Sequence, residues 1–159
     1  MKKHKKIVAI QGDSIQTINT KTDTTFLLAL EAQRRGYKIY YYETKNLTFL
    51  KNKVYASCQL IEFNENKKKF YSIKDTKIVD LSKTSFIFMR QNPPFNMDYI
   101  TATFLLEKIS NKTRIFNDPF AVRNMPEKLY SMDFLQFMPP TIFTQDIRLI
   151  EKFRKKYKK

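Results

Sequence analysis

The sequence of 159 residues has few of the residue types on which common cofactor and metal sites depend. Only two glycines occur, Gly12 and Gly36. This excludes GxGxxG and Walker A loops within the chain, because both need several glycines to bring backbone amides onto phosphates. A single cysteine, Cys58, and a single histidine, His4, exclude an internal disulfide and argue against a zinc cluster or a histidine-based catalytic triad.

Long apolar runs are also absent. No stretch approaches 18 apolar residues, so no membrane span is predicted. The lysine-rich start is followed by only four apolar residues, which is too short for a secretory signal peptide, and we therefore expect a cytoplasmic protein. The same composition, with 42% hydrophobic and 14% aromatic residues, is typical of a globular chain and not of a disordered one.

Positive charge is in excess. Lysine and arginine number 30 against 15 acidic residues, a formal net charge of +15. Such a balance raises the hypothesis of a nucleic-acid-binding module, which needs its basic residues concentrated on one face. Here the excess is mostly dispersed lysine, and the tight clusters lie at the N-terminus, at Lys67–Lys69 and at Lys155–Lys159. Nucleic-acid binding is therefore the alternative, not the prediction.

Apolar runs alternate with helical patterns in the order expected of an α/β fold. Residues 7–10 predict a buried parallel strand, 24–35 a helix capped by Asp23 or Thr24, and 37–43 a second strand, which together form a βαβ unit. Two hairpin-like segments predict an antiparallel insertion around residues 46–80. Further strands are expected at 86–89 and 113–117, followed by a turn at Asp118-Pro119. Helices are expected from about 97, from 124–126 through Leu129 and as far as Phe137, and over 145–157.

Two polar loops follow predicted parallel strands, at residues 11–19 and 90–96. Ligands of open parallel sheets bind beyond the carboxyl ends of the strands, so these loops are the first candidates for a site. Arg90 can bind a substrate carboxylate through two parallel hydrogen bonds, or it can pair with an acid that holds its loop. Asn92, Asp13 and Asn19 are the other candidate ligands, with turn or cap formation as the alternative role of each.

Several segments resemble, in order and spacing, the N-terminal part of bacterial-type glutathione synthetases. These are ATP-grasp ligases that join γ-glutamylcysteine to glycine, and the resemblance covers nearly the whole chain. The matching segments are Asp13-Ser-Ile with Ile18-Asn19, Asp23-Thr-Thr-Phe26, Leu30-Glu-Ala-Gln-Arg-Arg-Gly-Tyr37, Phe86-Ile-Phe-Met-Arg-Gln-Asn-Pro-Pro-Phe-Asn96, Tyr99-Ile-Thr-Ala-Thr103, Asn117-Asp-Pro119, Arg123 and Glu127-Lys-Leu129.

The resemblance implies a preATP-grasp domain over residues 1–122 and the start of an ATP-grasp domain over 123–159. It implies that Lys128 meets the phosphates of ATP, although an exposed helical lysine is the alternative. The family uses ATP and Mg²⁺, and the metal ligands are expected outside this chain. We expect an N-terminal fragment, about half the family length, that is inactive alone. The whole enzyme is expected to be a homotetramer, and a stand-alone subunit that pairs with a separate ATP-grasp half is a further alternative.

The chain departs from the family pattern at a few positions. Asn92 and Asn96 stand where the family usually has aspartate, which removes a charge but keeps an acceptor, and Ser14 replaces proline. We expect Cys58 to be a small buried hydrophobe in the insertion and His4 to lie in a disordered terminus. The Tyr40–Tyr42 run is expected in the core and not on a base-stacking surface.

Overall fold

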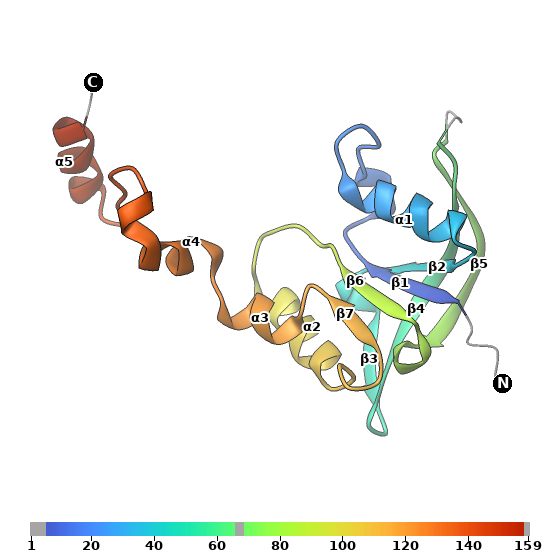
Figure 1. Ribbon diagram of the computed structural model, residues 1–159. Coiled ribbons are helices and arrows are strands. Elements are labelled where there is room, and N and C mark those ends of the chain that lie inside the picture. Colours follow the sequence, from blue (N-terminus) through green and yellow to red (C-terminus); the bar gives the residue numbers. More distant parts are fainter. Residues whose placement is uncertain (1–5, 66–68, 158–159) are drawn as a thin grey trace. The chain divides into compact units, whose positions relative to one another are not determined.

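The computed structural model describes residues 6–65 and 69–157, which divide between two compact units, Met1–Arg123 and Asn124–Lys159 (Figure 1). His4 and most of the predicted lysine cluster at 67–69 lie outside the described residues. The strands are β1 (Ile7–Gln11), β2 (Lys38–Tyr42), β3 (Leu47–Leu50), β4 (Lys53–Phe63), β5 (Tyr71–Asp80), β6 (Phe86–Met89) and β7 (Arg114–Phe116). The helices are α1 (Thr24–Arg34), α2 (Met97–Glu107), α3 (Pro119–Asn124), α4 (Glu127–Tyr130) and α5 (Ile147–Tyr157).

The sheet of the first unit has a parallel half and an antiparallel half. Its strands follow the order β3-β4-β2-β1-β6-β7, and β5 also pairs with β4. The strand β1 is parallel to both β2 and β6, and β6 is parallel to β7. The strand β4 is antiparallel to β2, β3 and β5. The predicted α/β class, with parallel strands, flanking helices and an antiparallel insertion around residues 46–80, is therefore confirmed.

The β1-α1-β2 unit forms as its sequence signals predict. The Asp23 side chain accepts a hydrogen bond of 2.7 Å from the backbone amide of Thr25, which caps the first turn of α1. Gly36 follows the last turn with φ at +78°, a left-handed conformation that glycine adopts at least cost. The helix therefore begins and ends where these residues permit, and β2 follows directly.

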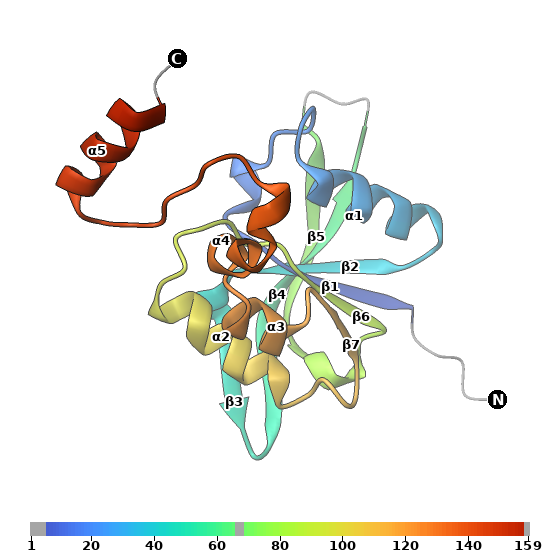
Figure 2. The same cartoon turned by 60° about the vertical axis from the view of Figure 1, so that its left-hand side comes forward.

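The parallel strands bury side chains on both faces. Figures 1 and 2 show α1 on one face and α2 on the other. The cluster on the α1 face includes Val8, Ile10, Phe26, Leu30, Ile39 and Tyr41. The cluster on the α2 face includes Ala9, Tyr40, Tyr42, Cys58, Ile87, Met89 and Leu106. Burial on both sides explains why these strands read as continuous apolar runs.

The antiparallel insertion contributes Cys58 to the core on the α2 face. Its side chain has no exposed surface, and burial raises the pKa of the thiol to about 12, so the thiol stays neutral. The prediction of a small buried hydrophobe is confirmed. Tyr40, Tyr41 and Tyr42 are only 2–4% exposed, which confirms that this run belongs to the core.

The structure differs from the sequence-based expectation in two helical segments. The turn expected at Asp118-Pro119 is the start of α3, because the Asp118 carboxylate accepts a bond of 2.8 Å from the amide of Ala121. Proline suits this first helical position because its missing N–H would be unpaired there anyway. In the second unit, α4 stops at Tyr130, and a 3₁₀ stretch continues to Phe137 with non-helical backbone angles at Phe134.

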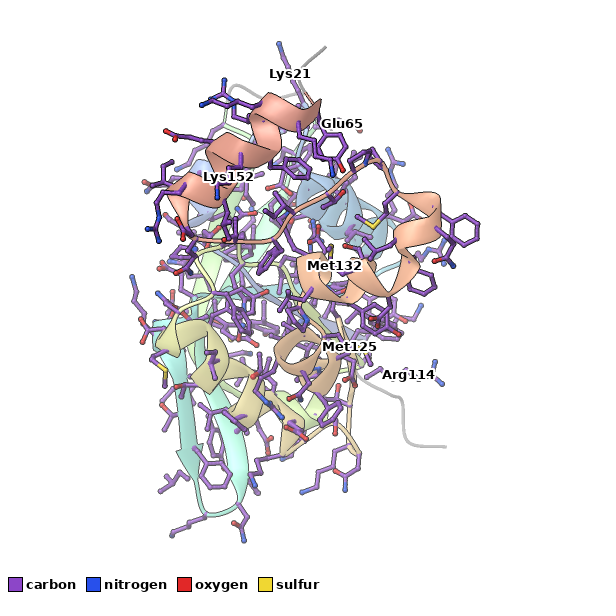
Figure 3. All side chains as sticks on the ribbon, turned by 90° about the vertical axis from the view of Figure 1, so that its left-hand side faces the viewer. Lys21, Glu65, Arg114, Met125, Met132 and Lys152 are labelled. Atoms are coloured by element: carbon purple, nitrogen blue, oxygen red, sulfur yellow. The ribbon has the colours of Figure 1, made fainter. Side chains whose placement is uncertain are left out.

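Charged side chains extend outward from both units. Figure 3 shows the side chains of Lys21 and Arg114 in the first unit and of Lys152 in the second pointing into solvent. In α5, isoleucine, leucine, phenylalanine and tyrosine alternate at helical spacing with basic residues. Within residues 6–65 and 69–157, no helix has the length and apolar character needed to cross a membrane.

Candidate functional site at the carboxyl ends of the parallel strands

The two loops that the sequence selects begin at the same edge of the sheet. The amide of Arg90, just past β6, donates to the carbonyl of Gln11 at 2.7 Å. The amide of Gly12, just past β1, donates to the carbonyl of Tyr42 at 3.0 Å. The parallel ladder therefore extends one residue beyond β1 and β6, and their loops start side by side, as the strand-end rule predicts.

Arg90 is fixed by two hydroxyl groups at the start of α1. Its Nη2 donates to Thr24 Oγ1 at 2.7 Å, and its Nε donates to Thr25 Oγ1 at 3.2 Å. The side chain is half-buried, and no carboxylate of the described residues forms an ion pair with it. Among the described residues, the contacts that hold Arg90 are therefore hydrogen bonds to hydroxyl groups. The guanidinium is held by neutral partners, which suits an anionic ligand.

Asp13 joins the two loops. One carboxylate oxygen, Oδ2, accepts from the backbone amide of Asn92 at 3.1 Å and from its side-chain Nδ2 at 2.7 Å. Because an aspartate at position 92 would have no side-chain N–H to donate, asparagine suits this contact better than the acid usual in the family pattern. The candidate residues Asp13 and Asn92 thus lie together and hydrogen-bond to each other.

Tyr41 stabilises the loop that follows β1. Its hydroxyl donates to the carbonyl oxygen of Asp13 at 2.8 Å. Burial, together with the nearby carboxylate of Asp13, raises the pKa of Tyr41 well above its usual range, so the hydroxyl remains a donor. A Cβ at position 12 would collide with this hydroxyl, so glycine is required there. The sequence analysis missed Tyr41 and the pair Thr24–Thr25, because their side chains reach the site only through tertiary contacts.

Two other predicted residues, Asn19 and Lys128, lie outside this set of contacts, as does Asn96, which departs from the family pattern. Asn19 is exposed, and its side-chain oxygen accepts from the amide of Lys21 at 3.0 Å, so it forms the turn that precedes α1. Asn96 caps α2 by accepting from the amide of Tyr99 at 3.0 Å. Lys128 is exposed in α4 of the second unit, with its Nζ 3.7 Å from Glu127 Oε1.

A set of buried polar side chains lies at the same strand ends on the face toward α2. Gln11, at the end of β1, and its register partner Tyr42, at the end of β2, are 0% and 2% exposed. Gln91, which follows β6, is 9% exposed. Neither the amide atoms of the two glutamines nor the Tyr42 hydroxyl has a hydrogen-bond partner in the described part of the chain. The sequence signal for Gln11 is its core-facing position directly after an apolar run.

Two clefts adjoin the loops. A polar cleft of about 280 Å³ lies at the end of β2 and is lined by, among others, Ser14, Gln16, Glu43, Ser57 and Gln59. A mainly apolar groove of about 340 Å³ includes Arg90 and lies between α1 and the strands β6 and β7. No group of three or more histidine, cysteine or acidic side chains in residues 6–65 and 69–157 could hold a metal ion.

The model of one protein family, the prokaryotic glutathione synthetase N-terminal domain, matches residues 7–123. The chain belongs to the prokaryotic glutathione synthetase family. The match spans the sheet and both strand-end loops of the first unit, so the geometry described above is that of a glutathione synthetase N-terminal domain.

Similar proteins agree with this family. The glutathione synthetase of Agrobacterium fabrum is 44% identical over 149 residues, which cover 94% of this chain and 47% of the relative. The glutathione synthetase of Mesorhizobium japonicum is 40% identical over 150 residues, and that of Buchnera aphidicola subsp. Baizongia pistaciae is 42% identical over 148 residues. These cover 94% and 92% of this chain and 48% and 46% of the relatives. The chain thus spans about half the length of the curated relatives it matches.

Proposed function

We propose that the strand-end loops of this chain bind γ-glutamylcysteine in a glutathione synthetase, an ATP-dependent carboxylate–amine ligase. Membership of the family and relatives named glutathione synthetase support this proposal. The observation that carries it is the guanidinium of Arg90, which sits at the functional edge of the sheet without an acidic partner among the described residues. The dipeptide carries two carboxylates that such a group can bind through paired hydrogen bonds.

In the proposed reaction, the γ-phosphoryl group of ATP passes to the cysteinyl carboxylate of the dipeptide. The amine of glycine then attacks the carbonyl carbon of the acyl phosphate, phosphate leaves with the C–O bonding pair, and the amine gives up a proton. Mg²⁺, when bound, would stabilise charge on the phosphates. The proposed contribution of the described residues is to bind and orient the dipeptide.

Four residues of the loops have a part in the proposed binding. Arg90 binds a carboxylate of the dipeptide, and Thr24 and Thr25 hold the guanidinium in place for it. Asp13 and Asn92 fix the two loops against each other, and the remaining oxygen of Asp13 and the Asn92 carbonyl are acceptors for the dipeptide's ammonium. Asn19 supports the first loop.

The nucleotide would be bound mainly by residues outside the first unit. We propose that residues 1–122 are the preATP-grasp domain, that residues 123–159 begin the ATP-grasp domain, and that Lys128 meets the phosphates of ATP as a point charge. The whole enzyme is proposed to be a cytoplasmic homotetramer. No contact described above favours nucleic-acid binding.

Isothermal titration of γ-glutamylcysteine into the 159-residue chain tests the proposal. Removing one charge-assisted bidentate contact should weaken binding about 10- to 100-fold, so we expect that loss for Arg90→Ala and a smaller one for Arg90→Lys. Arg114→Ala, which removes an exposed arginine of β7, is the matched control and should bind as the wild type does. Equal binding by Arg90→Ala and the wild type would show that Arg90 has only a structural role.

A further inference from the structure

The second unit has no core of its own. None of its described residues, 124–157, is buried. Large apolar side chains lie at its surface instead, and those of Phe137, Phe143 and Ile147 are 82%, 58% and 64% exposed. The first unit, in contrast, buries two clusters of apolar side chains. Exposed apolar surface of this extent marks an interaction site.

The second unit cannot supply the missing burial itself. It spans only Asn124–Lys159, and a unit of fewer than about 40 residues usually needs a disulfide, a metal or a partner to be stable. The single cysteine, Cys58, lies in the first unit. Residues 6–65 and 69–157 include no group of three or more histidine, cysteine or acidic side chains that could hold a metal ion. The remaining means of stabilising the unit is a protein surface that covers its apolar side chains.

Helix α5 has the most regular of these apolar surfaces. Four apolar residues spaced three or four apart form a stripe along one face of the helix, which we call the α5 stripe: Ile147, Ile150, Phe153 and Tyr157. The ring centroids of Phe153 and Tyr157 lie 4.7 Å apart, which keeps the stripe continuous. The other face is basic, and Figure 3 shows Lys152 on it pointing into solvent. An amphipathic helix of this kind docks by laying its apolar face into an apolar groove.

The charge of α5 disfavours a second copy of this chain as the partner. The charged residues of the helix are five bases and one acid: Arg148, Lys152, Arg154, Lys155, Lys156 and Glu151. Two copies that met along the α5 stripe would bring these basic residues close together, and like charges repel. The formal net charge of +15 on the whole chain adds to that repulsion. A partner of different sequence is therefore favoured.

The comparison with relatives indicates which partner that is. The family model for the N-terminal domain ends at residue 123. The match with the Agrobacterium fabrum enzyme covers 149 residues of this chain, so it must extend into the second unit. About half of that enzyme lies outside the match. The second unit thus resembles the part of the enzyme that adjoins its unmatched half.

We propose that the α5 stripe is a docking surface for the second half of a glutathione synthetase, and that the two halves assemble even when they are separate chains. The inference rests on the proposal that residues 123–159 begin the ATP-grasp domain, and it does not depend on dipeptide binding by the first unit. Docking would bury apolar side chains that the second unit leaves exposed, and this burial is the driving force for assembly.

Co-expression of the 159-residue chain with the unmatched C-terminal half of the Agrobacterium fabrum enzyme, tagged for purification, tests the proposal. We expect the two chains to be purified together as a one-to-one complex. Hydrogen exchange followed by mass spectrometry should show that the backbone amides of α5 exchange at least about tenfold more slowly in the complex than in the chain alone. The amides of β1 and β6, which belong to the core of the first unit, should show no comparable change.

Three glutamine substitutions in α5 test whether the stripe itself docks. Ile150→Gln and Phe153→Gln place a polar group on the stripe, whereas Lys152→Gln changes the basic face. Glutamine is a good helix former, so each variant should keep α5. The first two should each weaken association of the halves about 10- to 100-fold, because burial of a large apolar side chain is lost. Lys152→Gln should associate as the wild type does, as measured by dilution of the complex in sedimentation velocity runs.

The possible outcomes separate this inference from dipeptide binding. Weaker association of Ile150→Gln and Phe153→Gln but not of Lys152→Gln supports docking through the stripe, whether or not the chain binds γ-glutamylcysteine. If the C-terminal half is not recovered with the chain, or if all three variants associate equally, the inference is overturned. Slow exchange of α5 in the monomeric chain alone would mean that the first unit covers the stripe, and a dimer of the chain alone would mean that a second copy covers it. Either result also overturns the inference.

Discussion

Replacing Gln11 by methionine should stabilise the protein. The Gln11 side chain is fully buried, and neither its Nε2 nor its Oε1 has a hydrogen-bond partner in the described part of the chain. A buried polar group left unpaired costs about 1–3 kcal/mol. Methionine has a similar length and no strong polar group, so Gln11→Met should raise the free energy of unfolding by about 1–3 kcal/mol.

Two other glutamines, one hydrogen-bonded and one exposed, are controls for Gln11→Met. Gln33 donates from Nε2 to the carbonyl of Phe63 and accepts at Oε1 from its amide, both at 2.9 Å. Gln33→Met would break both bonds and should lower stability by about 1–3 kcal/mol. Gln16 is exposed, so Gln16→Met should change stability by less than about 0.5 kcal/mol.

Urea unfolding of the three variants and the wild type, followed by circular dichroism, measures these differences. The same substitution should therefore stabilise, destabilise or leave the protein unchanged according to the hydrogen bonds of the residue it replaces. A loss of 1 kcal/mol or more in Gln11→Met would refute the reasoning, since it would mean that the amide of Gln11 is well paired in solution.

Three further predictions concern other parts of the chain. Arg123→Ala should lower the free energy of unfolding by about 1–3 kcal/mol, because the side chain is only 13% exposed and its guanidinium pairs with Glu107 at 2.7 Å and stacks 3.9 Å from the Phe104 ring. Urea unfolding beside Arg148→Ala, which removes an exposed arginine, checks this, and equal small losses for the two variants would contradict it. With the pKa of Cys58 raised to about 12, only the unfolded thiol ionises just above pH 9, so stability should fall by about 1.4 kcal/mol per pH unit there. Unfolding at pH 8 and 10 should show a shallower fall for Cys58→Ala; an identical fall would refute it. The 159-residue chain with ATP, Mg²⁺, glycine and γ-glutamylcysteine should form no glutathione. Robust turnover would contradict the proposal that the reaction needs residues outside this chain.

Most elements of the first unit are predictable because local signals agree with tertiary packing. The strand at residues 7–11 is buried on both faces and so reads as an unbroken apolar run, and Asp23 and Gly36 mark the ends of α1 by their backbone chemistry. The short helix at 119–124 is missed because a proline after aspartate favours both a turn and a first helical position, and only the Asp118 cap decides between them.

The candidate site is predictable in its place but not in its contacts. Arg90, Asn92 and Asp13 follow strands that sequence patterns identify, and the parallel arrangement brings them to one edge. That Thr24 and Thr25 hold Arg90 depends on where α1 crosses the sheet, which a hydropathy pattern does not specify. The apolar groove between α1, β6 and β7 likewise depends on the register of β6 with β7, which joins residues nearly thirty positions apart.

Chemical-shift mapping of the 159-residue chain during titration with γ-glutamylcysteine tests the central claim most directly. We predict that the perturbed backbone amides concentrate in the loops after β1 and β6, around Asp13 and Arg90–Asn96, and at the start of α1. Arg90→Ala should require about 10- to 100-fold more dipeptide for the same perturbations. Perturbations confined to the β3–β4 hairpin or to the second unit, or none at millimolar dipeptide, would contradict the assignment of this edge as the dipeptide site.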